Sequence, residues 1–479
     1  MPKTPTFISP FFTVKKIAIT GASGCGKTTF LVSLLNHLQA HDPALFDMDV
    51  KNKKKKKFID FQLSTDRNHS YSPGTKKWQF TPFQEYRKQL ARGSFPDKTV
   101  SESWLAVRLA MKHWRRFAHL YLYDIPGERF ADAAILDREY SVWSDDIVGG
   151  MIHRDFKAGD QHKLTFIRDY ATLMNSQDES TLNSLNHEEI VLAYKKAMGE
   201  MLWRNYQGVC PSIFTLDEYG SDVMKEIERL CKNVPLDEAI TELASERQSG
   251  IKDKEFAPLS KKIRDNRPDL TKTMVENYKV YVEKQRRVFE VIIGCDGLIV
   301  LVDIAHILQG GKERLRDAYE FHDNVFNAVD PKKNILTPLW GALGITRVIS
   351  KIAVVASQTD RFHKDDESIL QNLADMLFDH PLNQIGGIEY KSFACASVRT
   401  TEIVDENNLK GVLSPSANST LFPVSRLPTG WENSPRFPDN WNPRDFKDIP
   451  RPHPPIPTLP SIPPPQTGMN EVLKFITDW

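Results

Sequence analysis

The sequence predicts an α/β protein with a doubly wound, mainly parallel sheet and a large helical insertion. Three observations support this: short apolar runs recur along the chain, helix-compatible segments follow several of them, and the strand pattern fades in the middle. The chain has 479 residues, of which 40% are hydrophobic and 26% charged. That is an ordinary globular composition, with length for roughly two or three domains.

The apolar runs are typical of parallel strands, because both faces of such a sheet are buried. They are residues 15–20, 119–124, 297–303, 351–357 and 390–397. Helical segments follow at 28–38 and 366–377, as in a doubly wound domain. The most apolar stretch, 291–308, contains Asp296 and Asp303. A buried strand followed by a loop accounts for it better than a membrane span.

The middle of the chain is predicted to be helical, because 187–206 and 275–292 have helical spacing and mixed charges. The expected parts are a first core segment at 14–139, a helical insertion domain at 140–287, a second core segment at 288–410, and a proline-rich C-terminal segment with a terminal helix at 411–479. Prolines concentrate at 435–465, which predicts extended geometry as a tether or a surface strap. The amphipathic stretch 470–479 is expected to dock back onto the fold.

The charge balance and the cysteine pattern limit the expected binding partners and cellular location. Lys plus Arg (63) nearly balances Asp plus Glu (62), so no specific nucleic acid is predicted as a partner. Five scattered cysteines and a start without a secretory signal favour a reducing, cytoplasmic location. The run Lys51–Lys57 is either a solvated loop or a contact with phosphates or anionic lipid, which would place the protein at the membrane periphery.

The segment GASGCGKT, Gly21–Thr28, matches the P-loop pattern and lies between a predicted strand and a predicted helix. Glycines let successive N–H groups face phosphates, and the helix N-terminus adds partial positive charge. Lys27 is expected to bridge the outer phosphates, and Thr28 to place its hydroxyl on Mg²⁺. The residues predicted to contact nucleotide in this segment are Ser23, Gly24, Cys25, Gly26, Lys27, Thr28 and Thr29.

A second motif, HLYLYDIPGERF, ends a strand with Asp124 and continues to Gly127. We expect Asp124 to be a partner of Mg²⁺ and the Gly127 N–H to contact the terminal phosphate. Glu128 either orients the attacking water or forms a surface salt bridge. Arg129 is a further candidate for stabilising charge on the phosphates.

A third motif, Ser-Gln-x-Asp, follows the strand at 351–357. Asp360 can accept two hydrogen bonds from guanine, whereas adenine offers no such pair of donors. The alternative role for Asp360 is a helix N-cap. Gln358 is the residue beside it in the base site, and Ser397 and Val398 are expected to supply backbone contacts to the base oxygen.

The order of these motifs resembles that of the YcjX-like family of P-loop NTPases, and the resemblance covers most of the chain. Its more specific parts are DIPGE at 124–128 and SVRT at 397–400. The resemblance implies a stress-associated cytoplasmic protein and identifies Thr99 as the switch threonine on Mg²⁺ and the terminal phosphate, with Thr75 as the alternative. The chain departs from the family pattern at Gln358, where a lysine is common.

The resulting prediction is a Mg²⁺-dependent GTPase that works as a nucleotide-controlled switch, with GTP and GDP as ligands. The catalytic residues would be Lys27, Thr99 and Glu128, and the metal would be held by Thr28, Thr99 and Asp124. The alternatives are an ATPase with ATP and ADP, a small-molecule kinase, and a scaffold in which nucleotide only stabilises the fold. An unidentified protein partner is expected to bind the helical insertion.

Overall fold

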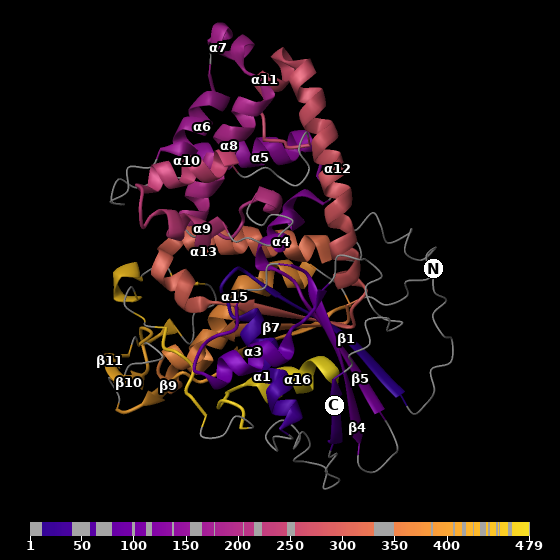
Figure 1. Cartoon of the computed structure of the whole chain (residues 1–479), viewed down its shortest axis with the longest axis vertical. Helices are drawn as coiled ribbons and strands as arrows, with labels where there is room; N and C mark the ends of the chain where they lie inside the picture. Colours follow the sequence, from indigo (N-terminus) through magenta and orange to yellow (C-terminus); the bar gives the residue numbers. More distant parts are fainter. Residues whose placement is uncertain are drawn as a thin grey trace. The chain divides into compact units, whose positions relative to one another are not determined.

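The computed structural model of the 479-residue chain describes the following residues: 12–40, 58–63, 79–97, 101–111, 117–136, 138–153, 165–176, 178–204, 206–214, 223–246, 254–329, 349–384, 387–405, 408–413, 418–424, 426–431, 437–438, 441–446, 449, 451–457 and 462–478. The chain forms two compact units (Figure 1). The sheet unit comprises Met1–Gly127, Val291–Lys332 and Leu336–Trp479, and the helical unit contains Glu128–Glu290. The helical unit therefore includes the expected insertion, 140–287, and begins before it.

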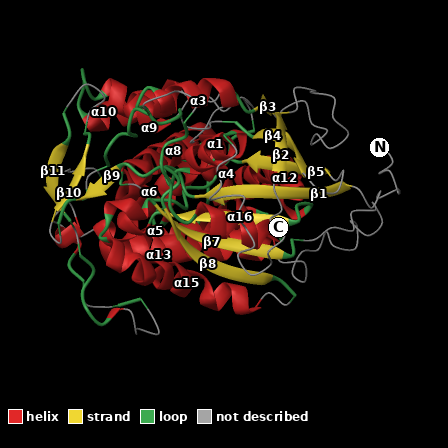
Figure 2. Ribbon diagram, turned by 90° about the horizontal axis from the view of Figure 1, so that it is seen from below, coloured by secondary structure: helices red, strands yellow, loops and turns green. Residues whose placement is uncertain are grey.

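The sheet unit is built on strands in the order β2-β4-β5-β1-β6-β7-β8, with β3 beside β4. The neighbours from β5 to β8 are parallel, whereas β4 is antiparallel to both β2 and β5. Figure 2 shows these strands with α1 and α3 on one side and α15 on the other. The α/β class with a mainly parallel sheet is thereby confirmed. The strands are β1 (Phe12–Gly21), β2 (Phe58–Leu63), β3 (Gln79–Phe80), β4 (Ser103–Met111), β5 (Phe117–Asp124), β6 (Gly297–Val302), β7 (Lys351–Ser357) and β8 (Glu389–Cys395).

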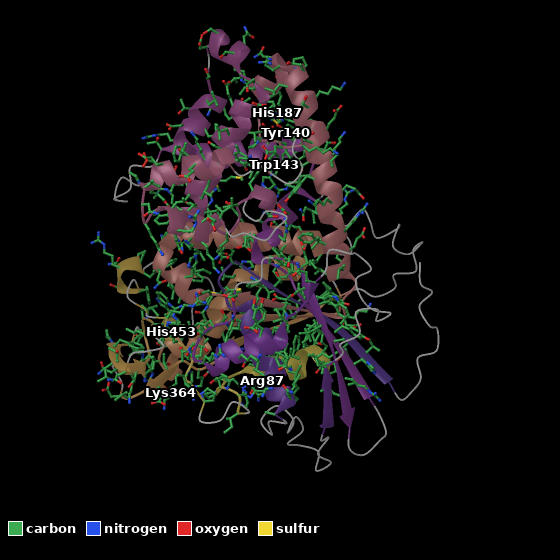
Figure 3. All side chains as sticks on the ribbon, in the orientation of Figure 1. Arg87, Tyr140, Trp143, His187, Lys364 and His453 are labelled. Carbon is green, nitrogen blue, oxygen red and sulfur yellow. The ribbon has the colours of Figure 1, made fainter. Side chains whose placement is uncertain are left out.

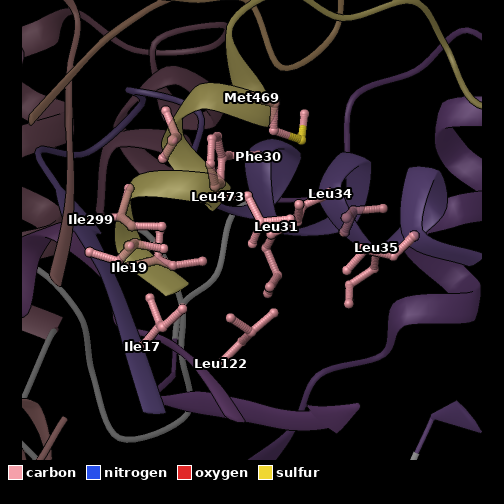
Figure 4. Close-up of a cluster of buried hydrophobic side chains, with 14 of the residues drawn as sticks. Ile17, Ile19, Phe30, Leu31, Leu34, Leu35, Leu122, Ile299, Met469 and Leu473 are labelled. Atoms are coloured by element: carbon pink, nitrogen blue, oxygen red, sulfur yellow. The ribbon is translucent and has the colours of Figure 1, made fainter. Parts of the chain in front are cut away.

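One face of the sheet is covered by α1 (Lys27–Gln39), α3 (Phe83–Ala91) and α16 (Met469–Thr477). Ile17 and Ile19 of β1 point into this core because alternate strand residues share a face. Figure 4 shows Met469 and Leu473 of α16 beside residues of α1. The buried residues of α16 have i, i+3, i+4, i+7 spacing, which is one helical face. The packing of α16 agrees with the expectation that the amphipathic stretch 470–479 docks back onto the fold.

The other face of the sheet carries α15 (Glu367–Gln384), which packs on β7 and β8, and α13 (Ile304–Val329), which packs on α15. The predicted loop after β6 is wrong, because α13 begins two residues after that strand ends. The helix is difficult to predict from the sequence because it contains the glycine pair Gly310-Gly311. Gly311 breaks the helical geometry (φ 71°, ψ −160°) and kinks α13 at that point.

The helical unit has an aromatic core. Tyr140, Trp143 and Tyr278 pack with ring centroids 5.3 to 5.8 Å apart, and Phe256 lies 5.5 Å from Trp143. Figure 3 labels Tyr140 and Trp143 together in this unit. Among the described helices, none has the length and apolar composition needed to cross a bilayer. The helices are α4 (Gly127–Ala131), α5 (Tyr140–His153), α6 (Phe166–Met174), α7 (Glu179–Ser184), α8 (His187–Trp203), α9 (Val223–Leu230), α10 (Leu236–Glu246), α11 (Lys261–Asn266) and α12 (Pro268–Ile293).

A small antiparallel sheet follows the main one, formed by β9 (Thr401–Ile403), β10 (Asn408–Gly411) and β11 (Thr420–Pro423). The described residues from Ile449 to Thr467, here called the strap, then run along the sheet unit. Backbone bridges join His453 to Val412 and Thr467 to Ala396. Through these two bridges the described residues of the strap pair with the chain beside β10 and with the end of β8.

Candidate functional site

The glycine loop, Gly21–Thr28, connects the end of β1 to the start of α1. Gly24 has φ 81°, and Gly26, the residue that precedes α1, has φ 94°. A Cβ on either residue would meet nothing within 4 Å, so glycine is required there for backbone conformation rather than for space. Gly21 is required for space as well, because its Cβ would lie 2.2 Å from the carbonyl oxygen of Leu301.

Lys27 points back into the glycine loop. Its Nζ donates to the carbonyl oxygens of Gly21 (3.0 Å) and Ala22 (2.8 Å), and the side chain is buried. Cys25 lies beside it, with Sγ 3.9 Å from Nζ. Burial raises the pKa of the Cys25 thiol although Lys27 opposes the shift. Cys25 is therefore a neutral, packed side chain rather than a reactive thiolate.

Thr28 and Asp124 meet at the carboxyl edge of the sheet. The Thr28 hydroxyl donates to Asp124 Oδ2 at 3.3 Å, and both side chains are buried. β5 lies parallel to β1, with Asp124 opposite Ile19, so the last residue of one strand reaches the loop that follows the other. A hydroxyl and a carboxylate are the oxygen donors that Mg²⁺ takes in proteins. The predicted metal-binding pair is thus brought together.

Gly127 packs directly against the glycine loop. A Cβ on Gly127 would lie 2.6 Å from backbone atoms of Gly21, Ala22 and Ser23. No side chain fits at this position without moving the loop. The backbone of the second motif therefore packs against the backbone of the glycine loop. Within the glycine-loop motif, Ser23 is exposed and Thr29 is buried on α1.

Glu128 and Arg129 are the first residues of the helical unit, and both are buried. Arg129 Nη1 donates to Ser212 Oγ at 3.0 Å. Asp132 accepts from the backbone N–H of Ser212 (2.8 Å) and from the hydroxyl of Tyr281 (2.8 Å). Burial raises the pKa of Asp132, and the Ser212 hydrogen bonds oppose that shift. Arg129 thus belongs to a buried polar network inside the helical unit.

Asp360 links the ends of β7 and β8. Its Oδ2 accepts from the backbone N–H (2.6 Å) and the hydroxyl (2.8 Å) of Thr400. Burial raises the pKa of Asp360, and both Thr400 hydrogen bonds oppose that shift. The alternative role as a helix N-cap is wrong: Gln358 precedes the short helix Thr359–Arg361, and the carboxylate reaches across to residue 400.

Ser397 and Val398 follow β8. The Ser397 carbonyl oxygen accepts the hydroxyl of Ser33 on α1 at 2.5 Å, and Val398 is buried in the same core as α1. This segment therefore ties the end of β8 to the helix that follows the glycine loop. Whether its backbone also contacts a base stays a prediction.

Gln358, which was predicted as a base-site residue, lies at the glycine loop together with Asp303 and Arg451, which were not predicted as site residues. Gln358 Nε2 donates to Asp303 Oδ2 at 3.2 Å and to the Gly24 carbonyl oxygen at 3.5 Å. Arg451 Nη2 donates to the same carbonyl at 2.9 Å. Asp303 could have been recognised, because it directly follows a buried strand at the ligand-binding edge of the sheet. Arg451 has no local signal, since it lies among prolines.

Three predicted features lie outside the described residues: Thr99, its alternative Thr75, and the run Lys51–Lys57. Their expected roles as switch threonine and as surface contact stay predictions.

The fold and the site together define an α/β protein with a glycine loop at the carboxyl edge of a mainly parallel sheet, the edge at which such proteins bind ligands. The family model for the YcjX-like family, DUF463, matches residues 15–216 and 253–476. The chain belongs to this family, as the order of its motifs indicated. The matched ranges include every described residue of the glycine loop, Asp124, Asp360 and Arg451.

Proposed function

We propose that the protein is a Mg²⁺-dependent P-loop nucleoside triphosphatase that prefers GTP and works as a nucleotide-controlled switch. One observation carries the proposal: Lys27 Nζ lies inside a glycine loop at a helix N-terminus, 2.8 and 3.0 Å from two loop carbonyls. An ammonium group and outward-turned N–H groups in such a loop are suited to phosphate oxygens. The lysine would exchange its two carbonyl partners for phosphate oxygens when nucleotide binds.

The neighbouring residues fit the same ligand. Gly24 and Gly26 leave open space where a Cβ would stand, and Thr28 and Asp124 offer oxygens 3.3 Å apart. These two residues would hold Mg²⁺, which neutralises charge on the phosphates when bound. Gly127 is packed against the loop, and its N–H would contact the terminal phosphate.

The preference for guanine rests on Asp360, a carboxylate after β7 at the same edge of the sheet. ATP is the alternative substrate, and one observation favours it: Asp360 Oδ2 already accepts two hydrogen bonds from Thr400. Those bonds give the carboxylate a structural role that does not require a nucleotide base to be bound. The two substrates are distinguished by direct binding measurements.

The switch proposal rests on the chain connection after Gly127. The residue that would contact the terminal phosphate is followed at once by Glu128, where the helical unit begins. Glu128 is our candidate for placing the attacking water, and Thr99 for sensing the terminal phosphate. The helical unit would present the nucleotide state to a protein partner.

The test is equilibrium binding of fluorescent GDP and ADP, with and without Mg²⁺, together with phosphate release from GTP and ATP. We expect Mg²⁺-dependent binding with GDP preferred, and loss of binding in Lys27→Ala. Lys364→Ala, an exposed lysine in the same unit (Figure 3), is the matched control and should behave as wild type.

Normal binding by Lys27→Ala would overturn the proposal. Equal or tighter ADP binding would instead make the protein an ATPase. Tight nucleotide retention with phosphate release no faster than in buffer would leave a nucleotide-stabilised scaffold.

A further inference from the structure

The carbonyl oxygen of Gly24 is held by two side chains that come from distant parts of the chain. Gln358 approaches it from the end of β7, at 3.5 Å. Arg451 approaches it from the strap, 427 residues after Gly24, at 2.9 Å. The bond from Arg451 is the shorter of the two, and it is charge-assisted because the guanidinium is charged. The amide of Gln358 is neutral and also donates to Asp303.

This contact fixes the orientation of one peptide group. In a trans peptide the C=O of Gly24 and the N–H of Cys25 point in opposite directions. The Gly24 oxygen faces Arg451, so the Cys25 N–H faces into the glycine loop, where it donates a long bond of 3.4 Å to the Ala22 oxygen. Gly24 has positive φ and no side chain to resist rotation. The bond from Arg451 therefore restrains a peptide that is otherwise easy to turn.

Arg451 is itself held in place. Its guanidinium lies over the ring of Phe95, 5.7 Å from the ring centroid, and the ring of His453 stacks on Phe95 at 6.4 Å. The backbone N–H of His453 donates to the Val412 oxygen at 2.6 Å. On the other side of Arg451, the carbonyl oxygen of Ile449 accepts from Arg361 at 3.0 Å. The strap is thus anchored on both sides of the arginine.

We propose that Arg451 is a positioning residue for nucleotide binding, through which the strap controls the affinity of the glycine loop for phosphates. It aims the Cys25 N–H into the loop, and its permanent positive charge supplements that of Lys27. The ligand class is a nucleoside di- or triphosphate, so this inference rests on the proposed function.

The experiment compares fluorescent GDP binding and dissociation for wild type, Arg451→Ala, Arg451→Lys and Arg444→Ala. Arg444 is an exposed arginine in the same C-terminal region, so its variant controls for loss of one positive charge. We expect Arg451→Ala to bind GDP roughly tenfold or more weakly, which corresponds to one charge-assisted hydrogen bond. Arg451→Lys should recover part of that loss through faster binding or slower release, and Arg444→Ala should match wild type.

Thermal unfolding without nucleotide separates positioning from folding. Because Arg451 is exposed, Arg451→Ala should unfold close to the wild-type temperature while its GDP affinity falls. Should that variant fail to fold, Arg451→Gln, which keeps a donor without the charge, takes its place. GDP affinity equal to or tighter than wild type in the arginine variants would overturn the inference. Failure of the wild type to bind any nucleotide would overturn the proposed function instead.

Discussion

Gly127 lies so close to Gly21 that a Cβ built on Gly127 would be 2.6 Å from the Gly21 carbonyl oxygen. Gly127→Ala should therefore displace the glycine loop, destabilise the fold by roughly 1–3 kcal/mol and weaken nucleotide binding. Thermal unfolding and GDP titration measure both effects. Gly149→Ala is the control, because a Cβ there meets nothing within 4 Å in the middle of α5. It should be neutral or stabilising by roughly 0.5–1 kcal/mol.

Asp124 is expected to carry the Mg²⁺ dependence. In Asp124→Asn the charge beside the Thr28 hydroxyl is lost, and the gain in nucleotide affinity on adding Mg²⁺ should fall roughly 10–100-fold. Asp296→Asn is the control, because Asp296 accepts the Lys16 N–H (2.8 Å) from the residue before β6, at the opposite end of that strand from the glycine loop. Titrating Mg²⁺ at fixed nucleotide gives the comparison. An unchanged Mg²⁺ response in Asp124→Asn would remove its assignment as a metal partner.

Asp360 has a structural role, and we predict a recognition role that can be separated from it. Asp360→Asn should weaken the hydrogen bonds from Thr400 and lower the free energy of unfolding by roughly 1–3 kcal/mol. It should also reduce the preference for GDP over ADP. Thr400→Val removes one of the hydrogen bonds to Asp360 but keeps the carboxylate. It should lower the unfolding temperature and leave the base preference intact. If both variants keep the wild-type preference, Asp360 does not read the base.

Glu128 is predicted to act in hydrolysis rather than in binding. Glu128→Gln should slow phosphate release roughly 10²–10⁴-fold, the usual range for a lost general base, while nucleotide affinity stays near wild type. Single-turnover hydrolysis and GDP titration separate the two quantities. Glu188→Gln, on the exposed surface of α8, should change neither. An unaltered rate in Glu128→Gln would assign the water-placing role to another group.

The titration of His322 is expected to make the stability of the protein depend on pH. The ring is buried between α13 and α15, its Nδ1 donates to the Ala318 oxygen at 2.7 Å, and the ring of Phe378 lies 4.7 Å away. Burial lowers the pKa of His322 from 6.5 to about 4, although the bond to Ala318 opposes the shift. Between pH 4 and 6.5 the unfolded chain therefore binds more protons at this residue than the folded chain does.

Stability should consequently fall as the pH drops from 6.5 towards 4, by up to about 3 kcal/mol from this histidine alone. Denaturant unfolding at several pH values measures the slope. His322→Leu removes the titrating group and should flatten the curve over this window. An equally steep curve in the variant would assign the acid sensitivity to other residues.

The buried parallel strands could be predicted because burial on both faces produces uninterrupted apolar runs, as in β6 and β7. The antiparallel strand β4 (Ser103–Met111) was harder, because it includes Arg108, which is only partly buried. The strands β9, β10 and β11 have three or four residues each. So short a segment shows no reliable alternation.

The candidate site also has a part that could be predicted from the sequence and a part that could not. The spacing of the two motifs identifies Lys27, Thr28 and Gly127, because the loop and turn that hold these residues are formed by neighbouring residues in the sequence. Arg451 reaches Gly24 across 427 residues, and nothing near it in the sequence encodes that contact. Only the folded path of the strap shows it.

The position of α16 also determines when the molecule can finish folding. Met469, Val472, Leu473 and Ile476 fill the core that β1 and α1 line, yet α16 is synthesised long after β1 and α1. Until α16 has been made, the apolar side of α1 lacks the cover that these residues provide. The nascent chain must keep that surface from aggregating during the interval, and a variant without α16 would leave it exposed.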